Sequence, residues 1–354
     1  MDERLVRFRK TITEYDIDAM LITNPFNRRY LSRFEGTSGV LLISRDEAFL
    51  VTDFRYTEQA AIQAKEFTVR RWQDNLYKNL APIIKEAGWE KLGFEAKHIV
   101  FSTYNDMKEK LPAELVPLED TVEKQRMQKS EEELKALRSG ARILDQAYEF
   151  ILSTIKPGQA EKELALELEI YLLRQGAEER AFQFIVASGE RGAMPHGTAA
   201  DRRMQEGDLV TIDYGAVFDG YATDMTRTLA LGKFDEKQKE IYYLVLEAQQ
   251  EAVRAVRPGM KASDLDAVAR DIIDRAGYAN YFGHGLGHGI GLETHEQPVL
   301  NPRSKTILEP GMTVTIEPGI YIGDWGGVRI EDMVVVTGSG GETLTASPRE
   351  LSVV

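Results

Sequence analysis

Hydrophobic residues in the first 120 positions follow two alternating patterns. Some segments repeat apolar residues at the helical spacing, and others are short continuous apolar runs typical of buried strands. Alternation of the two predicts a small α/β domain, in which helices flank a sheet. The expected helices are 3–15, 76–87 and 102–110, and the expected strands are 18–23, 40–44, 48–53 and 92–95.

A polar stretch at 119–129, EDTVEKQRMQK, separates this region from the rest and is interpreted as a linker. Ser130 and Glu133 follow it with the spacing of a capping box, which predicts the start of a helix. The chain has 354 residues, more than a single domain usually contains. We therefore expect two domains, 1–122 and 123–354.

The second domain contains an internal duplication. Helix-ending Pro-Gly pairs occur at 157–158 and 258–259, 101 residues apart. The strand-like run VTID at 210–213 recurs as VTIE at 314–317. We expect a duplicated helix–helix–hairpin unit whose two copies face each other across a pseudo-two-fold axis.

The first predicted hairpin carries two aspartates. Asp219-Gly220 is a strong signal for a two-residue turn. Such a turn pairs Asp213 with Thr226 and makes Asp224 a diagonal neighbour of Asp213 on the same face. Diagonal neighbours lie about 7–8 Å apart at Cα, so one ion can bridge their side chains.

The second copy is expected to repeat this arrangement with glutamates. A loop over 323–327 pairs residue 322 with 328 and Glu317 with Met333, so that Glu331 becomes the diagonal neighbour. Four clustered carboxylates cannot all stay ionised without counter-charge, and hard divalent cations supply it. Any one of these residues alone would be read as a surface acid, but their repetition at equivalent positions favours a metal site.

Composition narrows the class of protein. Cysteine is absent, which excludes disulfides and a thiol nucleophile and fits a reducing cytosol. The charged N-terminus lacks a signal-peptide pattern, and no apolar run reaches the roughly 18 residues of a membrane span. A net charge of −13 disfavours nucleic-acid binding. We expect a cytoplasmic protein with neither membrane nor nucleic acid as a partner.

Three of the five histidines crowd into HGLGHGIGLETHE at 284–296. The alternating glycines disfavour a helix, so an extended backbone is expected there. In that backbone His284 and His288 still share a face. No Gly-x-Ser-x-Gly motif supports a serine nucleophile.

The motifs IDYG, TDMTRT, HGLGHGIGLETHE, TIEPG and VRIED, in this order, resemble those of the M24 metallopeptidases, which have the pita-bread fold. The resemblance is strong over 123–354. Residues 1 to about 120 resemble the creatinase-type N-terminal domain of the Xaa-Pro branch, and MPHG at 194–197 also resembles that branch.

The resemblance implies two divalent metal ions, with Mn²⁺ favoured and Co²⁺ or Zn²⁺ possible for a site of carboxylates and imidazole. The implied metal ligands are Asp213, Asp224, His288, Glu317 and Glu331. The implied catalytic residues are Glu317 as the proton shuttle for a metal-bridging hydroxide, His295 at the oxyanion, and His196. His196 and His284 resemble histidines that line a proline pocket. Arg329 either meets the substrate, orients Glu331 or forms a structural ion pair.

The expected activity is hydrolysis of Xaa-Pro bonds in dipeptides or at peptide N-termini, by a homodimer. The substrate is a peptide with proline at its second position. Two alternatives remain: an aminopeptidase that does not require proline, and a pita-bread interaction module that has lost catalysis.

Overall fold

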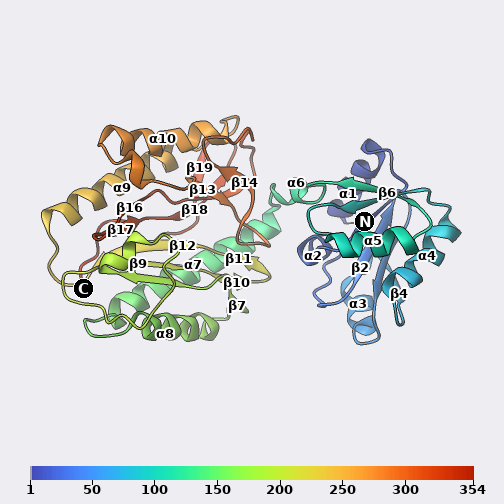
Figure 1. Ribbon diagram of the computed structural model, residues 1–354, viewed down its shortest axis with the longest axis horizontal. Helices are drawn as coiled ribbons and strands as arrows, with labels where there is room; N and C mark the ends of the chain where they lie inside the picture. The colour runs from blue at the N-terminus through green and yellow to red at the C-terminus, as the bar shows by residue number, and fades with distance from the viewer. Residues whose placement is uncertain (1) are drawn as a thin grey trace. The chain divides into compact units, whose positions relative to one another are not determined.

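The computed structural model describes residues 2–354, which form two compact α/β units that divide between Arg126 and Met127 (Figure 1). The boundary expected from the sequence lay after residue 122. The stretch interpreted as a linker contains a short helix, α6 (Glu123–Arg126). Arg126 is 2% exposed and donates to Asn27 Oδ1 at 2.8 Å, so this helix is packed into the first unit.

The first unit is built on a mixed six-stranded sheet in the order β4-β3-β2-β1-β5-β6. Its four inner strands are the apolar runs predicted from the sequence. The two edge strands were not predicted, because β4 is largely exposed and polar, and the short apolar run of β6 is only partly buried and is interrupted by Pro117. The strands are β1 (Ala19–Ile22), β2 (Val40–Ser44), β3 (Ala48–Thr52), β4 (Thr68–Arg71), β5 (Lys91–Glu95) and β6 (Glu114–Leu118). The helices are α1 (Glu3–Glu14), α2 (Pro25–Ser32), α3 (Thr57–Gln63), α4 (Leu76–Ala87) and α5 (Phe101–Lys110).

The second unit shows the predicted duplication in its helices. These are α7 (Glu131–Thr154), α8 (Glu161–Arg174), α9 (Glu236–Ala255) and α10 (Ala262–Arg275). The capping box of Ser130 and Glu133 begins α7, as predicted. Gly158 and Gly259, which follow the first helix of each copy, have φ of 87° and 81°. Each Pro-Gly pair lies in the turn just after its helix, which ends at Thr154 or Ala255, and glycine adopts the left-handed backbone of this turn at little cost.

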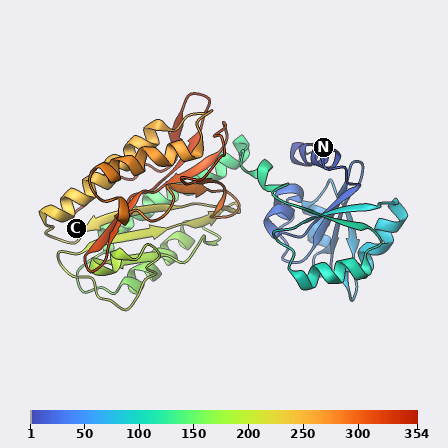
Figure 2. The same ribbon diagram turned by 45° about the horizontal axis from the view of Figure 1, so that its top comes forward.

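Strands lie between α8 (green) on one side and α9 (yellow) and α10 (orange) on the other in both views (Figures 1 and 2). Two antiparallel sheets carry or flank the five expected metal ligands. Their strand orders are β12-β9-β8 and β14-β13-β15-β18-β19. The first-copy strands are β7 (Glu179–Arg180), β8 (Ile185–Ser188), β9 (Leu209–Tyr214), β10 (Ala216–Phe218), β11 (Tyr221–Ala222) and β12 (Met225–Ala230). The second-copy strands are β13 (Gly287–Gly289), β14 (Glu296–Leu300), β15 (Thr313–Ile316), β16 (Gly319–Ile322), β17 (Gly326–Arg329), β18 (Asp332–Val336) and β19 (Gly341–Thr343).

The core of the second copy is formed where α9 and α10 pack their buried faces against the strands. Ile241 and Val245 of α9 lie in one apolar cluster with Val314 of β15 and Val334 of β18, all fully buried. This packing fixes the strands that bear the candidate ligands. Within residues 2–354, no helix combines the length and apolarity required to cross a membrane.

Candidate metal centre

The first hairpin has the geometry that the sequence predicted. Asp219 and Gly220 both have positive φ, 49° and 75°, as a two-residue type I′ turn requires. The ladder pairs Asp213 with Thr226, which confirms the expected register. Asp224 lies between β11 and β12 and is 4% exposed, so the hairpin holds two carboxylates near each other on one face.

The second hairpin turns earlier than the sequence predicted. Ile322 pairs with Gly326, so the loop comprises only 323–325, and the expected pairing with Val328 is wrong. Gly326 was taken for a loop residue but belongs to β17. A Cβ there would lie 2.7 Å from the carbonyl oxygen of Gly189, so this glycine allows two backbones to approach closely.

This shift changes how the two glutamates face each other. Ile316 pairs with Asp332 across β15 and β18. Glu317 follows Ile316 and Glu331 precedes Asp332, so the two glutamates occupy directly opposite positions. The expected pairing of Glu317 with Met333 is wrong, because Met333 pairs with Thr315.

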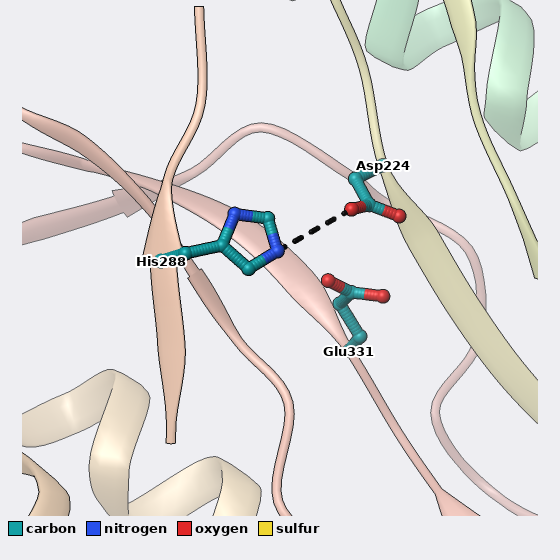
Figure 3. A group of neighbouring side chains, drawn as sticks. All are labelled: Asp224, His288 and Glu331. Carbon is teal, nitrogen blue, oxygen red and sulfur yellow. Dashed lines mark ion pairs between the residues drawn. The ribbon is translucent and has the colours of Figure 1, made fainter. Parts of the chain in front are cut away.

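His288 enters from a third strand, β13, and faces both hairpins (Figure 3). One ligand atom each from His288, Asp224 and Glu331 lies within 4.8 Å of the other two. The His288 Nε2 atom is 3.7 Å from Asp224 Oδ2 and 3.3 Å from Glu317 Oε1. Its Nδ1 atom lies 3.0 Å from the carbonyl oxygen of Gly289, which favours the tautomer with a free Nε2 lone pair. The extended backbone expected for 284–296 is found at β13, which carries His288, whereas 291–295 form bends.

The buried carboxylates provide an internal test of whether cations fit here. Asp213 Oδ1, Asp224 Oδ1 and Glu331 Oε1 are buried and have no hydrogen-bond partner among the described residues. The second oxygen of Asp213 accepts from Arg329 at 2.7 Å, and that of Glu331 accepts from Thr226 Oγ1 at 2.7 Å. Buried polar atoms are rarely left without a partner. One oxygen of Asp213 and one of Glu331 are thus fixed by the protein, and the unpartnered oxygens of all three carboxylates are left for a hard cation.

The electrostatics agree with this interpretation. Burial, followed by repulsion from neighbouring carboxylates, raises the pKa of Asp224 and of Glu331 well above the ordinary values. Burial also raises the pKa of Glu317. The pKa of His288 is lowered by burial, so its imidazole is neutral near pH 7 and able to bind a metal ion. A divalent cation would offset the charge that burial makes costly.

Arg329 lies next to Asp213 and is only 3% exposed. Its guanidinium forms an ion pair with Asp213 and donates to Thr226 Oγ1 at 3.2 Å and to the Tyr321 hydroxyl at 3.0 Å. It also donates to the carbonyl oxygen of Pro195 at 3.2 Å. Arg329 therefore meets Asp213 directly and Glu331 only through Thr226.

Tyr321 and Thr226 were not identified from the sequence. The Tyr321 hydroxyl lies 2.9 Å from His284 Nε2, and burial raises the pKa of Tyr321 to about 12. Neither threonine nor tyrosine is a residue type that indicates a metal site in a sequence. The roles of Thr226 and Tyr321 depend on contacts between distant strands. Position Thr226 could have been noticed, because the predicted register already placed it opposite Asp213.

The structure brings the remaining predicted histidines to the same region. The ring centroids of His288 and His295 are 4.2 Å apart. Burial lowers the pKa of His295, and the charges of His288 and His196 lower it further. His196 itself is exposed and directly follows Pro195, which contacts Arg329.

Comparison with known proteins matches both units to described families. Residues 135–338 match Metallopeptidase family M24, and residues 4–128 match the Creatinase/Prolidase N-terminal domain. The chain is 42% identical to the Xaa-Pro dipeptidase of Pyrococcus furiosus, over 99% of this chain and all of that protein.

Solved structures agree with this assignment. The Xaa-Pro dipeptidase from Bacillus anthracis superimposes with a TM-score of 0.98 at 47% identity and covers 99% of both chains. The X-Pro aminopeptidase from Thermotoga maritima superimposes with a TM-score of 0.91 at 36% identity, over 98% of this chain and all of that one. The paired hairpins with their buried carboxylates thus lie in a pita-bread domain, and the chain belongs to metallopeptidase family M24.

Proposed function

We propose that this chain hydrolyses Xaa-Pro peptide bonds and uses two divalent metal ions to do so. The proposed ligands are Asp213, Asp224, His288, Glu317 and Glu331. The observation that carries the proposal is the set of three buried carboxylate oxygens without a hydrogen-bond partner, on Asp213, Asp224 and Glu331. Two of these carboxylates, Asp224 and Glu331, each offer a ligand atom within 4.8 Å of one from His288. The similar proteins are named as Xaa-Pro dipeptidases and an X-Pro aminopeptidase, which supports the substrate class.

Mn²⁺ is the favoured metal, because carboxylates dominate the donor set and hard ligands suit it; Co²⁺ and Zn²⁺ are the alternatives. Bound divalent ions supply Lewis acidity and lower the pKa of water toward neutrality. The protein supplies a buried, preorganised donor set. The Thr226 and Arg329 contacts hold Glu331 and Asp213 before any ion binds.

Two side chains are assigned to proton transfer and charge stabilisation. Glu317 has a pKa raised by burial, so it can take up a proton from the attacking water and release it later. His295 is neutral near pH 7 and partly accessible, and we assign to it a hydrogen bond to the oxyanion of the scissile carbonyl.

We assign proline specificity to His284 and His196. Arg329 supports both positions, because it donates to the Tyr321 hydroxyl and to the carbonyl oxygen of Pro195. An Xaa-Pro amide has no N–H, so the site must hold the ring by shape and protonate the departing nitrogen. His284 is held by Tyr321 and can present its ring in a fixed orientation. His196 is exposed, as a residue that receives substrate should be.

A peptide panel tests the proposal. Protein loaded in turn with Mn²⁺, Co²⁺ or Zn²⁺ is given Met-Pro, Met-Ala, Met-Pro-Gly and Met-Ala-Gly, and release of methionine is measured. We expect cleavage of the proline peptides to be much faster. Equal rates for Met-Pro and Met-Ala would replace this proposal with a broader aminopeptidase. A protein that binds no metal and cleaves none of the peptides would be a non-catalytic module. The ratio of Met-Pro to Met-Pro-Gly rates decides between dipeptidase and aminopeptidase.

We further propose that the protein is a homodimer. The support is the creatinase-type N-terminal unit, which such peptidases use for association. Light scattering at micromolar concentration should give twice the 39.9 kDa chain mass. A monomer mass across that range would rule the dimer out.

A further inference from the structure

An ion pair on α10 stands behind the candidate site and is not part of the proposed ligand set. Asp266 and Arg270 lie one helical turn apart. The guanidinium binds the carboxylate through two nitrogens, Nε to Oδ2 at 2.7 Å and Nη2 to Oδ1 at 2.9 Å. Asp266 is 1% exposed. A two-point contact of this kind fixes the guanidinium plane as well as its charge.

The pair holds the loop that carries His284. Arg270 donates to the carbonyl oxygen of Phe282 at 3.0 Å and to that of His284 at 2.7 Å. Its guanidinium also lies 4.2 Å from the centroid of the Phe282 ring. Asp266 Oδ1 accepts from the Leu286 main-chain nitrogen at 2.9 Å. Two side chains of α10 therefore fix three main-chain groups of the loop.

The same loop reaches the catalytic residues on its other side. The Leu286 carbonyl oxygen accepts from the Glu317 main-chain nitrogen at 2.8 Å. The His284 ring places Nε2 against the Tyr321 hydroxyl and Nδ1 2.7 Å from the carbonyl oxygen of Gly285. Any displacement of the loop from α10 would therefore move both the His284 ring and the Glu317 main chain.

The loop has little room to adapt. A Cβ on Gly285 would lie 2.5 Å from the carbonyl oxygen of Leu300, and one on Gly287 would lie 2.0 Å from that of Thr315. The backbone is thus pressed against β14 and β15 without side chains between them. The loop can therefore move only away from the sheet. The hydrogen bonds from Arg270 and to Asp266 oppose this movement.

We infer that Arg270 is a positioning residue for cleavage of Xaa-Pro substrates, because it sets the place of the His284 ring relative to Glu317. The substrate part of this inference rests on the proposed function, in which His284 contacts the proline ring. Lysine cannot replace Arg270 fully, since one ammonium cannot reproduce a planar fork that serves a carboxylate and two carbonyls.

The test compares Arg270→Met, Arg270→Lys and Asp266→Asn with the wild type, all loaded with Zn²⁺. Arg254→Met is the matched control: Arg254 pairs with Glu251 on α9, also within one helical turn, but both side chains are largely exposed. We expect kcat/KM for Met-Pro to fall about 10- to 100-fold in Arg270→Met at full metal content, with partial recovery in Arg270→Lys. Arg254→Met should equal the wild type.

A second readout does not depend on activity. The chain has only five histidines, so ¹⁵N-histidine labelling of the Zn²⁺-loaded protein gives a simple imidazole spectrum. His284→Gln assigns the His284 signal. We expect Arg270→Met to shift that signal while the signal of His98, in the first unit, stays in place. If Arg270→Met does not fold, the other two variants carry both measurements.

An unchanged His284 signal would overturn the inference whether or not kcat/KM falls, because Arg270 would then not set the place of the ring. A shifted ring with unchanged kcat/KM would also overturn it, because the ring position would then not matter to the substrate. If the wild-type protein does not cleave Met-Pro with Mn²⁺, Co²⁺ or Zn²⁺, the proposed function fails, and the imidazole spectrum alone decides whether Arg270 positions His284.

Discussion

Arg227 and Asp332 form an ion pair whose side chains are both fully buried, with Nη2 2.7 Å from Oδ1. They directly follow Thr226 and Glu331, which are hydrogen-bonded to each other at 2.7 Å. Successive side chains of a strand point to opposite faces. The ion pair therefore joins the first and second copies on the face opposite the carboxylates. Arg227 also donates to the main-chain oxygens of Thr226 and Glu331.

The first prediction concerns this pair. Arg227→Met removes the fully buried ionic partner of Asp332 and leaves only the partly exposed Arg349, so it should lower the free energy of unfolding by about 3 kcal/mol. Urea unfolding followed by circular dichroism measures it. Arg254→Met is the control, because the Arg254 side chain is exposed and should leave the midpoint where it is. A midpoint for Arg227→Met equal to that of the control would contradict the prediction.

The second prediction concerns Glu331. Its replacement by alanine removes one proposed ligand and leaves the other buried carboxylates without adequate counter-charge. Turnover should fall by at least about 10³-fold, as when one member of a catalytic group is removed. Bound metal per chain, measured by mass spectrometry, should fall as well. Glu342→Ala removes an exposed carboxylate that pairs with Arg138 and serves as the control. Near wild-type turnover of Glu331→Ala at saturating metal would remove Glu331 from the ligand set.

The third prediction concerns the hydrogen bond from Thr226 to Glu331. Thr226→Val keeps the side-chain shape and removes the hydroxyl. Metal affinity should weaken about 10- to 100-fold, since a group that orients a ligand commonly contributes this much. Competition with a chelating dye measures the affinity. Thr226→Ser retains the hydroxyl and should bind metal nearly as the wild type does. Equal affinities for the valine and serine variants would show that the bond does not orient Glu331.

The fourth prediction concerns pH and metal removal. Folding raises the pKa of Asp224 and Glu331 above their ordinary values of 3.8 and 4.5, so the folded metal-free protein holds protons that the unfolded chain releases. Its stability is therefore greatest below those ordinary values and decreases as pH rises through the raised pKa values, by about 1.4 kcal/mol per pH unit for each retained proton.

Urea unfolding between pH 5 and 8 in the presence of a chelator checks this slope. Metal-free Glu331→Gln lacks one of the raised groups and should show a shallower decrease. With saturating Mn²⁺ the trend should reverse, because metal binding requires ionised carboxylates. Parallel slopes for the wild type and Glu331→Gln would argue against a proton held at Glu331.

Local features of this protein were decided by the sequence itself. The Asp219-Gly220 turn selects one pairing, and strand alternation then sends Asp213 and Asp224 to the same face. The Ser130 capping box and the Pro-Gly turns at 157–158 and 258–259 depend on residues close together in the chain. These features depend on backbone geometry and on hydrogen bonds between near neighbours, so the sequence alone predicts them. The family motifs added the ligand set by resemblance.

Contacts between distant segments were decided only by the tertiary structure. The second hairpin was misjudged because Gly326 serves close approach to Gly189 rather than the turn. The partners Thr226 and Glu331 lie 105 residues apart, and Arg270 meets the His284 loop only because α10 packs beside it. No local propensity encodes such pairs. They form when burial of the apolar helix faces brings the two copies together, and the same burial gives the clustered carboxylates their raised pKa values and their need for a cation.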